Sequence, residues 1–229
     1  MDRKNEIASY LAAVRESIAA ACVSAGRTSD EVTLIAVTKT YPASDVAILL
    51  ELGVGDIGEN RDQEAAPKAA SIPQARWHFI GQLQRNKAKS VVTYAHMVHS
   101  VDSVPVARTL AAQAASRRQV PLDVLIQVSL DDVPGRGGVP FAELPAVAEA
   151  VAESASLRLK GLMAVAPLGD DPRVAFDRLH RYSTMFQADY PDATVLSAGM
   201  SEDLAAAIAC GATHVRIGSA LLGKRSALR

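Results

Sequence analysis

Short apolar runs alternate with longer amphipathic segments along almost the whole chain. Eight runs have the length and the β-branched content of buried strands, and they cover residues 34–39, 54–57, 77–80, 96–101, 122–128, 159–165, 194–196 and 214–217. The segments between them predict helices over residues 42–52, 83–90, 104–118, 141–153, 172–188 and 201–210. A further helix follows the second strand and ends near residue 70. A helix over residues 3–25 precedes the first strand, because Ile7, Leu11, Val14, Ile18 and Ala21 recur at steps of three and four.

This alternation of strands and helices is typical of parallel sheets built from βαβ units. Eight such strands predict a (β/α)8 TIM barrel, and no linker or shift in composition divides it, so we expect one domain over residues 1–229. Only seven of the strands are followed by a helix, and we expect the additional N-terminal helix to cover the remaining part of the barrel. The alternative fold is an open doubly wound sheet, which would need more polar edge strands than these.

Composition narrows the class of protein further. The chain has 229 residues, of which 49% are hydrophobic, and a net charge of −1, so it can build a core but offers no basic surface for nucleic acid. No apolar run approaches the ~18 residues of a membrane helix, and the charged N-terminus does not resemble a secretory signal. The two cysteines, Cys22 and Cys210, lie far apart in helical patterns. We therefore expect no disulfide framework and a location in the reducing cytoplasm.

Lys39 ends the first predicted strand, Leu34-Ile35-Ala36-Val37-Thr38-Lys39. Burial disfavours the charged form of a lysine, and an uncharged amine can attack a carbonyl to form a Schiff base. The other interpretation is a surface lysine just past the strand end that pairs with a carboxylate.

In such barrels the active site lies at the carboxyl ends of the strands. The polar residues predicted there are Lys39, Asn60, His78, Ser197, Ser201, Arg216 and Ser219. The loops after the last two strands commonly hold a phosphate, and here they contain small residues over 197–201 and 218–219. We expect Ser201 to cap the following helix, and capping alone would also explain this loop. Arg216 interrupts an apolar run, and a ring nitrogen or a carboxylate inside the barrel mouth would satisfy it.

Three other patterns do not lead to a site. Residues 53–58 match GxGxxG, but a helix precedes these glycines, whereas a dinucleotide site needs a strand before them and a helix after them. Residues 218–225 nearly match a phosphate-binding P-loop, but Arg225 replaces the Ser or Thr that would hold magnesium. His96 and His99 are three apart on a strand and face opposite sides, so we expect no metal site.

Several motifs in order resemble one known family over almost the whole chain. They are Thr38-Lys39-Thr40, Gly58-Glu59-Asn60, Trp77-His78-Phe79-Ile80-Gly81, Gly161-Leu162-Met163-Ala164, Ser197-Ala198-Gly199-Met200-Ser201-Glu202-Asp203 and Val215-Arg216-Ile217-Gly218. This set is similar to the pyridoxal phosphate homeostasis proteins, which are single-barrel relatives of the alanine racemase N-terminal domain. The resemblance implies the fold-type III barrel of pyridoxal 5′-phosphate (PLP) proteins.

The resemblance also implies a role for each matched residue. Lys39 would carry PLP as a Schiff base, and Ser201, Gly218 and Ser219, with the backbone around Met200, would hold the phosphate. Arg216 would lie near the pyridine nitrogen, Asn60 near the ring, and His78 would line the mouth. The chain departs from the family at Arg61, where an aromatic residue is usual, and over Pro134-Gly135-Arg136-Gly137-Gly138, where many relatives carry a lysine before the glycine.

From this resemblance we expect a cytoplasmic, monomeric protein that binds PLP, supplies it to PLP-dependent apoenzymes and influences the balance of amino acids and keto acids. No catalytic residue is implied. One alternative is a PLP-dependent enzyme such as an amino-acid racemase with Lys39 as base. Alanine racemases, however, take a catalytic tyrosine from a second domain. We expect no such domain here, because too few residues follow the last strand. Another is a barrel enzyme that binds a sugar phosphate. Lys87, Lys89 and Lys224 are the other lysines that could carry the cofactor.

Overall fold

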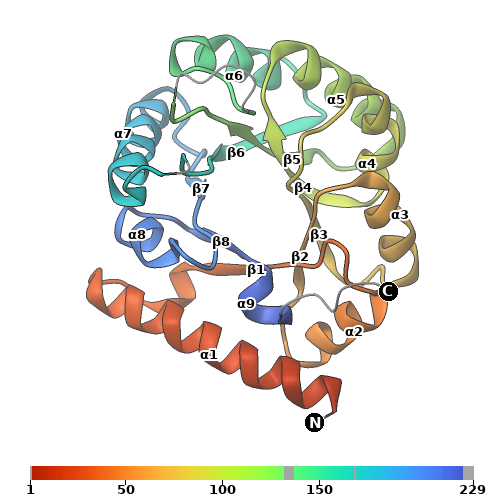
Figure 1. Ribbon diagram of the computed structural model, residues 1–229. Helices are drawn as coiled ribbons and strands as arrows, with labels where there is room; N and C mark the ends of the chain where they lie inside the picture. Colours follow the sequence, from red (N-terminus) through yellow and green to blue (C-terminus); the bar gives the residue numbers. More distant parts are fainter. Residues whose placement is uncertain (1, 132–136, 168, 224–229) are drawn as a thin grey trace.

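The strands of the computed structural model form a closed parallel barrel in which each strand pairs with its neighbours in sequence and β1 pairs with β8 (Figure 1). The structure describes residues 2–131, 137–167 and 169–223. The strands in these residues are β1 (Thr33–Val37), β2 (Asp56–Glu59), β3 (Arg76–Phe79), β4 (Ala95–Val101), β5 (Leu122–Gln127), β6 (Leu157–Met163), β7 (Val195–Ser197) and β8 (His214–Ile217). The predicted (β/α)8 barrel is confirmed, and the open sheet is wrong.

Helices surround the barrel on the outside (Figure 1). The α-helices are α1 (Arg3–Ser24), α2 (Ala43–Glu51), α3 (Asp62–Ser71), α4 (Ala88–Tyr94), α5 (Val104–Arg117), α6 (Leu144–Ala152), α7 (Pro172–Asp189), α8 (Leu204–Ala209) and α9 (Ser219–Leu222). Short 3₁₀ helices are η1 (Ser29–Glu31), η2 (Arg85–Lys87) and η3 (Phe141–Glu143). The predicted helices over 83–90 and 141–153 each begin with one of these 3₁₀ turns, and the first of them continues four residues further, to Tyr94.

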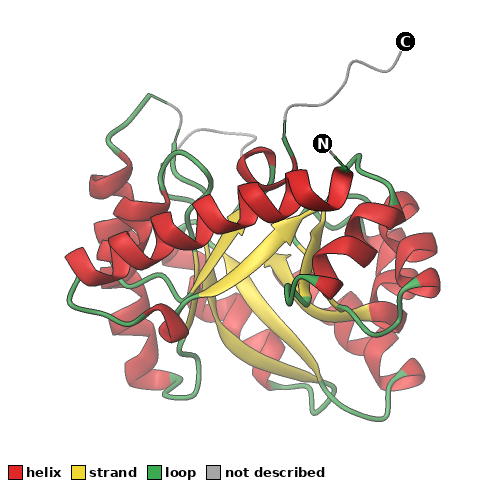
Figure 2. Ribbon diagram, turned by 90° about the horizontal axis from the view of Figure 1, so that it is seen from below, coloured by secondary structure: helices red, strands yellow, loops and turns green. Residues whose placement is uncertain are grey.

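The additional N-terminal helix occupies the place predicted for it. Helix α9 has four residues, and α1 lies across the outside of the barrel beside α8, α9 and α2 (Figures 1 and 2). Its buried face consists of Ile7, Leu11, Val14, Ile18 and Cys22, so Cys22 takes the place expected for Ala21. By length and composition alone α1 could cross a membrane, but this apolar face is packed against the barrel.

Arg3 fastens α1 to two distant parts of the chain. Its Nη2 lies 2.5 Å from Oδ2 of Asp45, and it also donates to the carbonyl of Leu222 at 3.1 Å. The hydroxyl of Tyr41 donates to the carbonyl of Gly223 at 2.6 Å. These bonds join α1, α2 and the segment after β8, where the last barrel unit lacks a long helix.

The second strand begins two residues later than its apolar pattern predicts. Val54 is 4% exposed, but its N–H donates to the carbonyl of Leu49 and closes the carboxyl end of α2. Gly53 has φ +79°, the left-handed conformation that such a helix end favours in glycine. The apolar character of Val54 therefore serves the helix end, and the strand starts at Asp56.

The interior of the barrel is only partly apolar. A small cluster of Met97, Leu125 and Met163 fills one part of it. Buried polar side chains from β2, β3, β4, β7 and β8 fill another part, and they are Asp56, His78, His99, Ser197 and Arg216. The larger apolar clusters lie between the strands and the surrounding helices.

Candidate functional site

Four neighbouring strands bring most of the predicted site residues to one mouth of the barrel. Strands β7, β8, β1 and β2 pair in this order, and all are parallel, so their carboxyl ends lie together. Lys39 follows β1, Asn60 follows β2, Gly218 follows β8 and Ser201 lies in the turn after β7. These four residues therefore lie at the same end of the barrel.

Lys39 is exposed and lies in a turn two residues beyond the end of β1. The expectation of a strand that ends in a buried lysine is wrong, because β1 stops at Val37 and the chain turns. The amine of Lys39 makes no hydrogen bond or ion pair with any of the described residues, so the paired surface lysine of the other interpretation is not observed either. The amine of Lys39 is therefore accessible to an aldehyde that enters the mouth.

The turn that carries Lys39 is held in a strained conformation. Thr40 has φ +69°, and it is the one non-glycine residue at positive φ among the described residues. A β-branched residue in this region costs roughly 1–2 kcal/mol. The N–H of Thr40 donates to Glu64 Oε2 at 2.8 Å, and the N–H of Tyr41 donates to the carbonyl of Thr38 at 3.0 Å. Such strain is a common property of functional sites.

A buried ion pair supports this turn from below. Nζ of Lys68 lies 2.6 Å from Oε1 of Glu59 and donates to the carbonyl of Thr38 at 2.9 Å. The hydroxyl of Thr38 donates to the same Glu59 oxygen at 2.7 Å. The side chains of Lys68 and Glu59 are 11% and 1% exposed. Sequence reasoning missed Lys68, although its place nine residues after Glu59, on the helix that follows the strand, could have indicated it.

Arg216 is a buried cation without a carboxylate partner among the described residues. Its Nη1 donates to Oγ of Ser197 at 2.7 Å and its Nη2 to the carbonyl of Ala164 at 2.9 Å, which leaves three of its five N–H groups unused. Burial lowers the pKa of Arg216 to about 10, so the guanidinium remains charged at neutral pH. Such a group suits an acceptor that enters the mouth, as the sequence predicts.

The loop after β7 differs from the sequence expectation. Helix α8 begins at Leu204 with Asp203 at its N-cap position, so the prediction that Ser201 caps this helix is wrong. Ser201 is half-buried in the preceding turn. The N–H of Met200 donates to Oδ1 of Asp203 at 2.5 Å, which means that a carboxylate already occupies the backbone donor expected for a phosphate.

The loop after β8 approaches β1 closely. A side chain at Gly218 would meet the carbonyl and the side chain of Val37 at 3.5–3.6 Å, so the loop runs directly beside the strand that leads to Lys39. Ser219 is exposed and begins α9. On the other side of β1, Asn60 is half-buried, and a Cβ at Gly81 would lie 2.1 Å from the carbonyl oxygen of Asn60. Glycine at 81 is therefore required for Asn60 to keep its position.

His78 does not line the open mouth, and this expectation is corrected. It is 2% exposed inside the barrel, and both ring nitrogens are occupied, by Asp56 at 3.0 Å and by His99 at 2.9 Å. Because β3 places this side chain below the level of the strand ends, its ring faces other buried polar groups. Sequence reasoning set His99 aside as a poor metal ligand and so missed its link to His78. In the described residues no three His, Cys, Asp or Glu side chains form a group that could hold a metal.

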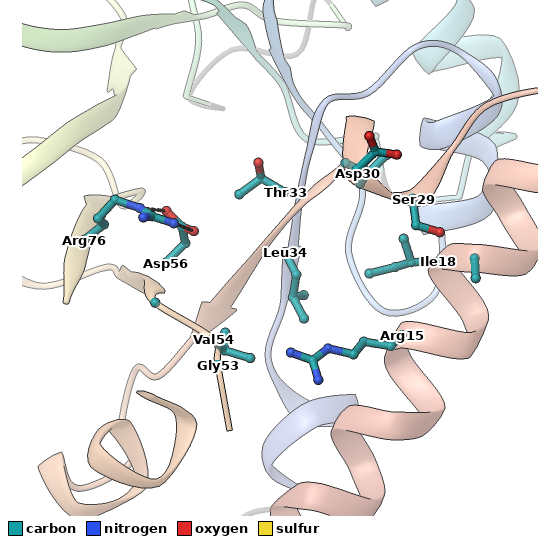
Figure 3. Close-up of a pocket in the computed structure, with 13 residues that line it drawn as sticks. Arg15, Ile18, Ser29, Asp30, Thr33, Leu34, Gly53, Val54, Asp56 and Arg76 are labelled. Carbon is teal, nitrogen blue, oxygen red and sulfur yellow. Dashed lines mark hydrogen bonds and ion pairs between the residues drawn. The ribbon is translucent and has the colours of Figure 1, made fainter. Parts of the chain in front are cut away.

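A pocket of about 580 Å³ lies at the opposite end of the barrel, between α1 and the amino ends of the first three strands (Figure 3). Arg76 and Asp56 form an ion pair on one side of it, and Arg15 lies on the side of α1 (Figure 3). No residue expected at the mouth lines this pocket. Of the other candidate lysines, Lys87 is half-buried in η2 and Lys89 is exposed, whereas Lys224 and residues 132–136 lie outside the described residues.

Comparison with known proteins gives concordant matches. Residues 11–226 match the family model described as alanine racemase, N-terminal domain. The chain is 43% identical to the pyridoxal phosphate homeostasis protein of Mycobacterium leprae, over 97% of this chain and 94% of that protein, and 41% identical to that of Escherichia coli K12, over 96% and 97%. Among solved structures, PipY of Synechococcus elongatus PCC7942 with PLP bound is similar with a TM-score of 0.82 and 33% identity, over 95% of this chain and 100% of that one.

Proposed function

The chain belongs to the pyridoxal phosphate homeostasis protein family, and on this premise we propose that it binds PLP and acts in PLP homeostasis as a carrier without catalytic turnover. The observation that carries the proposal is that Lys39, whose amine has no partner among the described residues, follows β1, while the buried and incompletely bonded guanidinium of Arg216 lies on the neighbouring strand β8. The names of the relatives and the PLP bound to PipY support the same assignment.

The side chains at the mouth fit this cofactor. PLP supplies an aldehyde that bonds to an amine as a Schiff base and an electron-withdrawing ring. Lys39 offers the amine after β1, and Asn60 follows the paired strand β2. Ser201, Gly218 and Ser219 would hold the phosphate with a hydroxyl and with backbone N–H groups of a loop free of large side chains. Met200 would contribute its N–H only after Asp203 releases it.

Arg216 suits a carrier, but it does not by itself separate a carrier from a racemase, since racemases also use an arginine there. Its guanidinium stays charged at neutral pH, so it donates and does not accept a proton. Beside a pyridine nitrogen it would hold that atom unprotonated, and an unprotonated ring is a weaker electron sink. His78 would not touch the cofactor and would act through Arg216. The alternative is a PLP-dependent enzyme with Lys39 as base, which the match to the alanine racemase domain keeps open.

The partners and location follow from the same proposal. We expect PLP-dependent apoenzymes to receive the cofactor and the protein to be monomeric. A cytoplasmic location is supported by Cys22 and Cys210, which are both unpaired thiols in the described residues.

Absorption spectroscopy tests this function. Purified protein mixed with an equimolar amount of PLP should turn yellow and retain the colour through desalting. It should leave added amino acids unchanged during prolonged incubation, and it should restore activity to a PLP-dependent apoenzyme. Steady turnover of an amino acid would identify an enzyme instead, and colourless protein after desalting would favour the sugar-phosphate alternative.

A further inference from the structure

Five buried side chains form a continuous hydrogen-bonded chain through the barrel. Asp56 Oδ1 lies 3.0 Å from His78 Nε2, and His78 Nδ1 lies 2.9 Å from His99 Nε2. His99 Nδ1 lies 3.0 Å from Ser197 Oγ, which accepts from Arg216 at 2.7 Å. The bond from β4 to β7 joins strands that are not neighbours, so it crosses the interior. The chain begins at the amino end of β2 and ends beneath the mouth.

The two ends fix the direction of the first and the last bond of the chain. A guanidinium can only donate, so Ser197 accepts from Arg216. Burial alone would raise the pKa of Asp56, but hydrogen bonds from Arg76 and His78 outweigh it and hold that pKa below its usual range. The carboxylate therefore only accepts, and Nε2 of His78 must carry a hydrogen.

Counting the hydrogens available for these bonds then assigns the protonation of both histidine rings. If His78 is neutral, its Nδ1 accepts from Nε2–H of His99, and Nδ1 of a neutral His99 accepts from the hydroxyl of Ser197. Every hydrogen on the two rings and on the serine hydroxyl then has an acceptor within the chain. If either ring were charged, His99 would donate to Ser197 and the serine hydrogen would have no acceptor, because Ser197 Oγ bonds only to Arg216 and His99 among the described residues. Burial, together with the nearby charge of Arg216, also lowers the pKa of His99.

We propose that Ser197, His99 and His78 are positioning residues that hold the Arg216 guanidinium beneath the mouth and link it to the Asp56 carboxylate at the opposite end of the barrel. Each ring is neutral and carries its hydrogen on Nε2. The effect on the cofactor rests on the proposed function, since Arg216 is expected to contact PLP. Buried polar chains of this kind are strong because each bond polarises the next.

Nuclear magnetic resonance of the cofactor-free protein tests the direction of the chain. In protein labelled with ¹⁵N-histidine, long-range ¹H–¹⁵N spectra distinguish the two neutral tautomers and the charged ring. His96→Gln, His180→Gln and His214→Gln identify the remaining signals, and none of the three removes a member of the hydrogen-bonded chain. We expect Nε2–H and an unprotonated Nδ1 in both His78 and His99 at pH 7.5. An Nδ1–H tautomer or a charged ring at either position would overturn the proposal, whether or not the protein binds PLP.

Asp56→Asn tests the coupling to the mouth, and Asp123→Asn is the matched control. Asp123 is also buried near the amino end of its strand and bonded by an arginine, Arg158, but it is not part of the chain. An amide can donate or accept, so Asp56→Asn should mix the His78 tautomers and weaken PLP binding about fivefold or more. Ser197→Ala, which cuts the chain beside Arg216, should have the same effect on binding. Equal affinity of Asp56→Asn and Asp123→Asn would refute the coupling. Wild-type protein that takes up no PLP would refute the proposed function. The histidine tautomers would still test the direction of the hydrogen-bonded chain.

Discussion

Replacing Lys68 by methionine should destabilise the fold and loosen the turn that carries Lys39. Methionine keeps the apolar stem of the lysine and removes its charge. The Glu59 carboxyl group, with a side chain that is 1% exposed, would then lose its cationic partner, and the carbonyl of Thr38 would lose its Nζ donor. Oε2 of Glu59 has no hydrogen-bond partner among the described residues, so no bond on that oxygen compensates for the loss.

The expected loss follows from the burial of this pair. Removing one partner of a buried ion pair costs about 3–5 kcal/mol, because the other charge is left without compensation. We expect a value near 3 kcal/mol, since Glu59 keeps its hydrogen bond from the Thr38 hydroxyl. The free energy of unfolding of such domains is about 5–15 kcal/mol, so Lys68→Met should still fold.

Urea unfolding followed by the fluorescence of Trp77 measures this loss. Trp77 is the single tryptophan and is 2% exposed, so it reports the loss of packing. Lys4→Met is the matched control, because Nζ of Lys4 lies 2.7 Å from Glu51 Oε2 but both side chains are half exposed. It should leave the unfolding curve unchanged. Glu59→Gln/Lys68→Met should be more stable than Lys68→Met alone, since no charge is left buried.

A loss below about 1 kcal/mol in Lys68→Met, the range of exposed pairs, would refute the interpretation of this pair as buried and essential. Lower stability of the double variant than of Lys68→Met would also contradict it, because the cost would then not come from the unpaired carboxylate. In either case another explanation for the strained turn at Thr40 would be needed.

Two further predictions concern stability. Burial holds the pKa of His214 at about 4, against 6.5 ordinarily, so the folded protein takes up this proton later than the unfolded chain as the pH falls. The contribution of His214 to the free energy of unfolding should therefore be complete above about pH 6.5 and decrease toward pH 4. Measured by urea unfolding, the decrease in the free energy of unfolding should be about 3 kcal/mol smaller in His214→Gln than in the wild type. An identical pH dependence in both proteins would contradict this. Gly81→Ala should lose about 2 kcal/mol, because the new methyl group overlaps the carbonyl of Asn60, whereas Gly55→Ala, with its nearest contact at 3.9 Å, should be almost neutral in the same assay.

The periodicity of the sequence was sufficient for the fold, because strand and helix patterns in strict alternation allow few architectures. Boundaries were less predictable where one apolar residue can serve two purposes. Val54 looks like part of a strand, but its backbone closes α2, and only the contact between its N–H and Leu49 shows this. Similarly, the run 34–39 does not reveal that the chain turns after Val37.

The mouth residues were predictable because parallel strands bring their carboxyl ends together. The hydrogen-bonded side chains beneath them in the barrel were not predictable. The bond between His99 and Ser197 joins residues 98 positions apart on strands that are not neighbours, and no local pattern encodes such a contact. The same holds for His78, whose motif indicated a site residue, while its depth in the barrel depends on the register of β3 against β2.

Reduction and peptide mapping test the central claim most directly. Protein incubated with PLP is treated with borohydride, which makes the bond between amine and cofactor permanent, and the labelled peptide is identified by mass spectrometry. We predict that the label lies on Lys39 and is absent from Lys39→Ala, while Lys87→Ala is labelled like the wild type. Label on another lysine with Lys39 unmodified, or equal labelling of Lys39→Ala, would contradict the account.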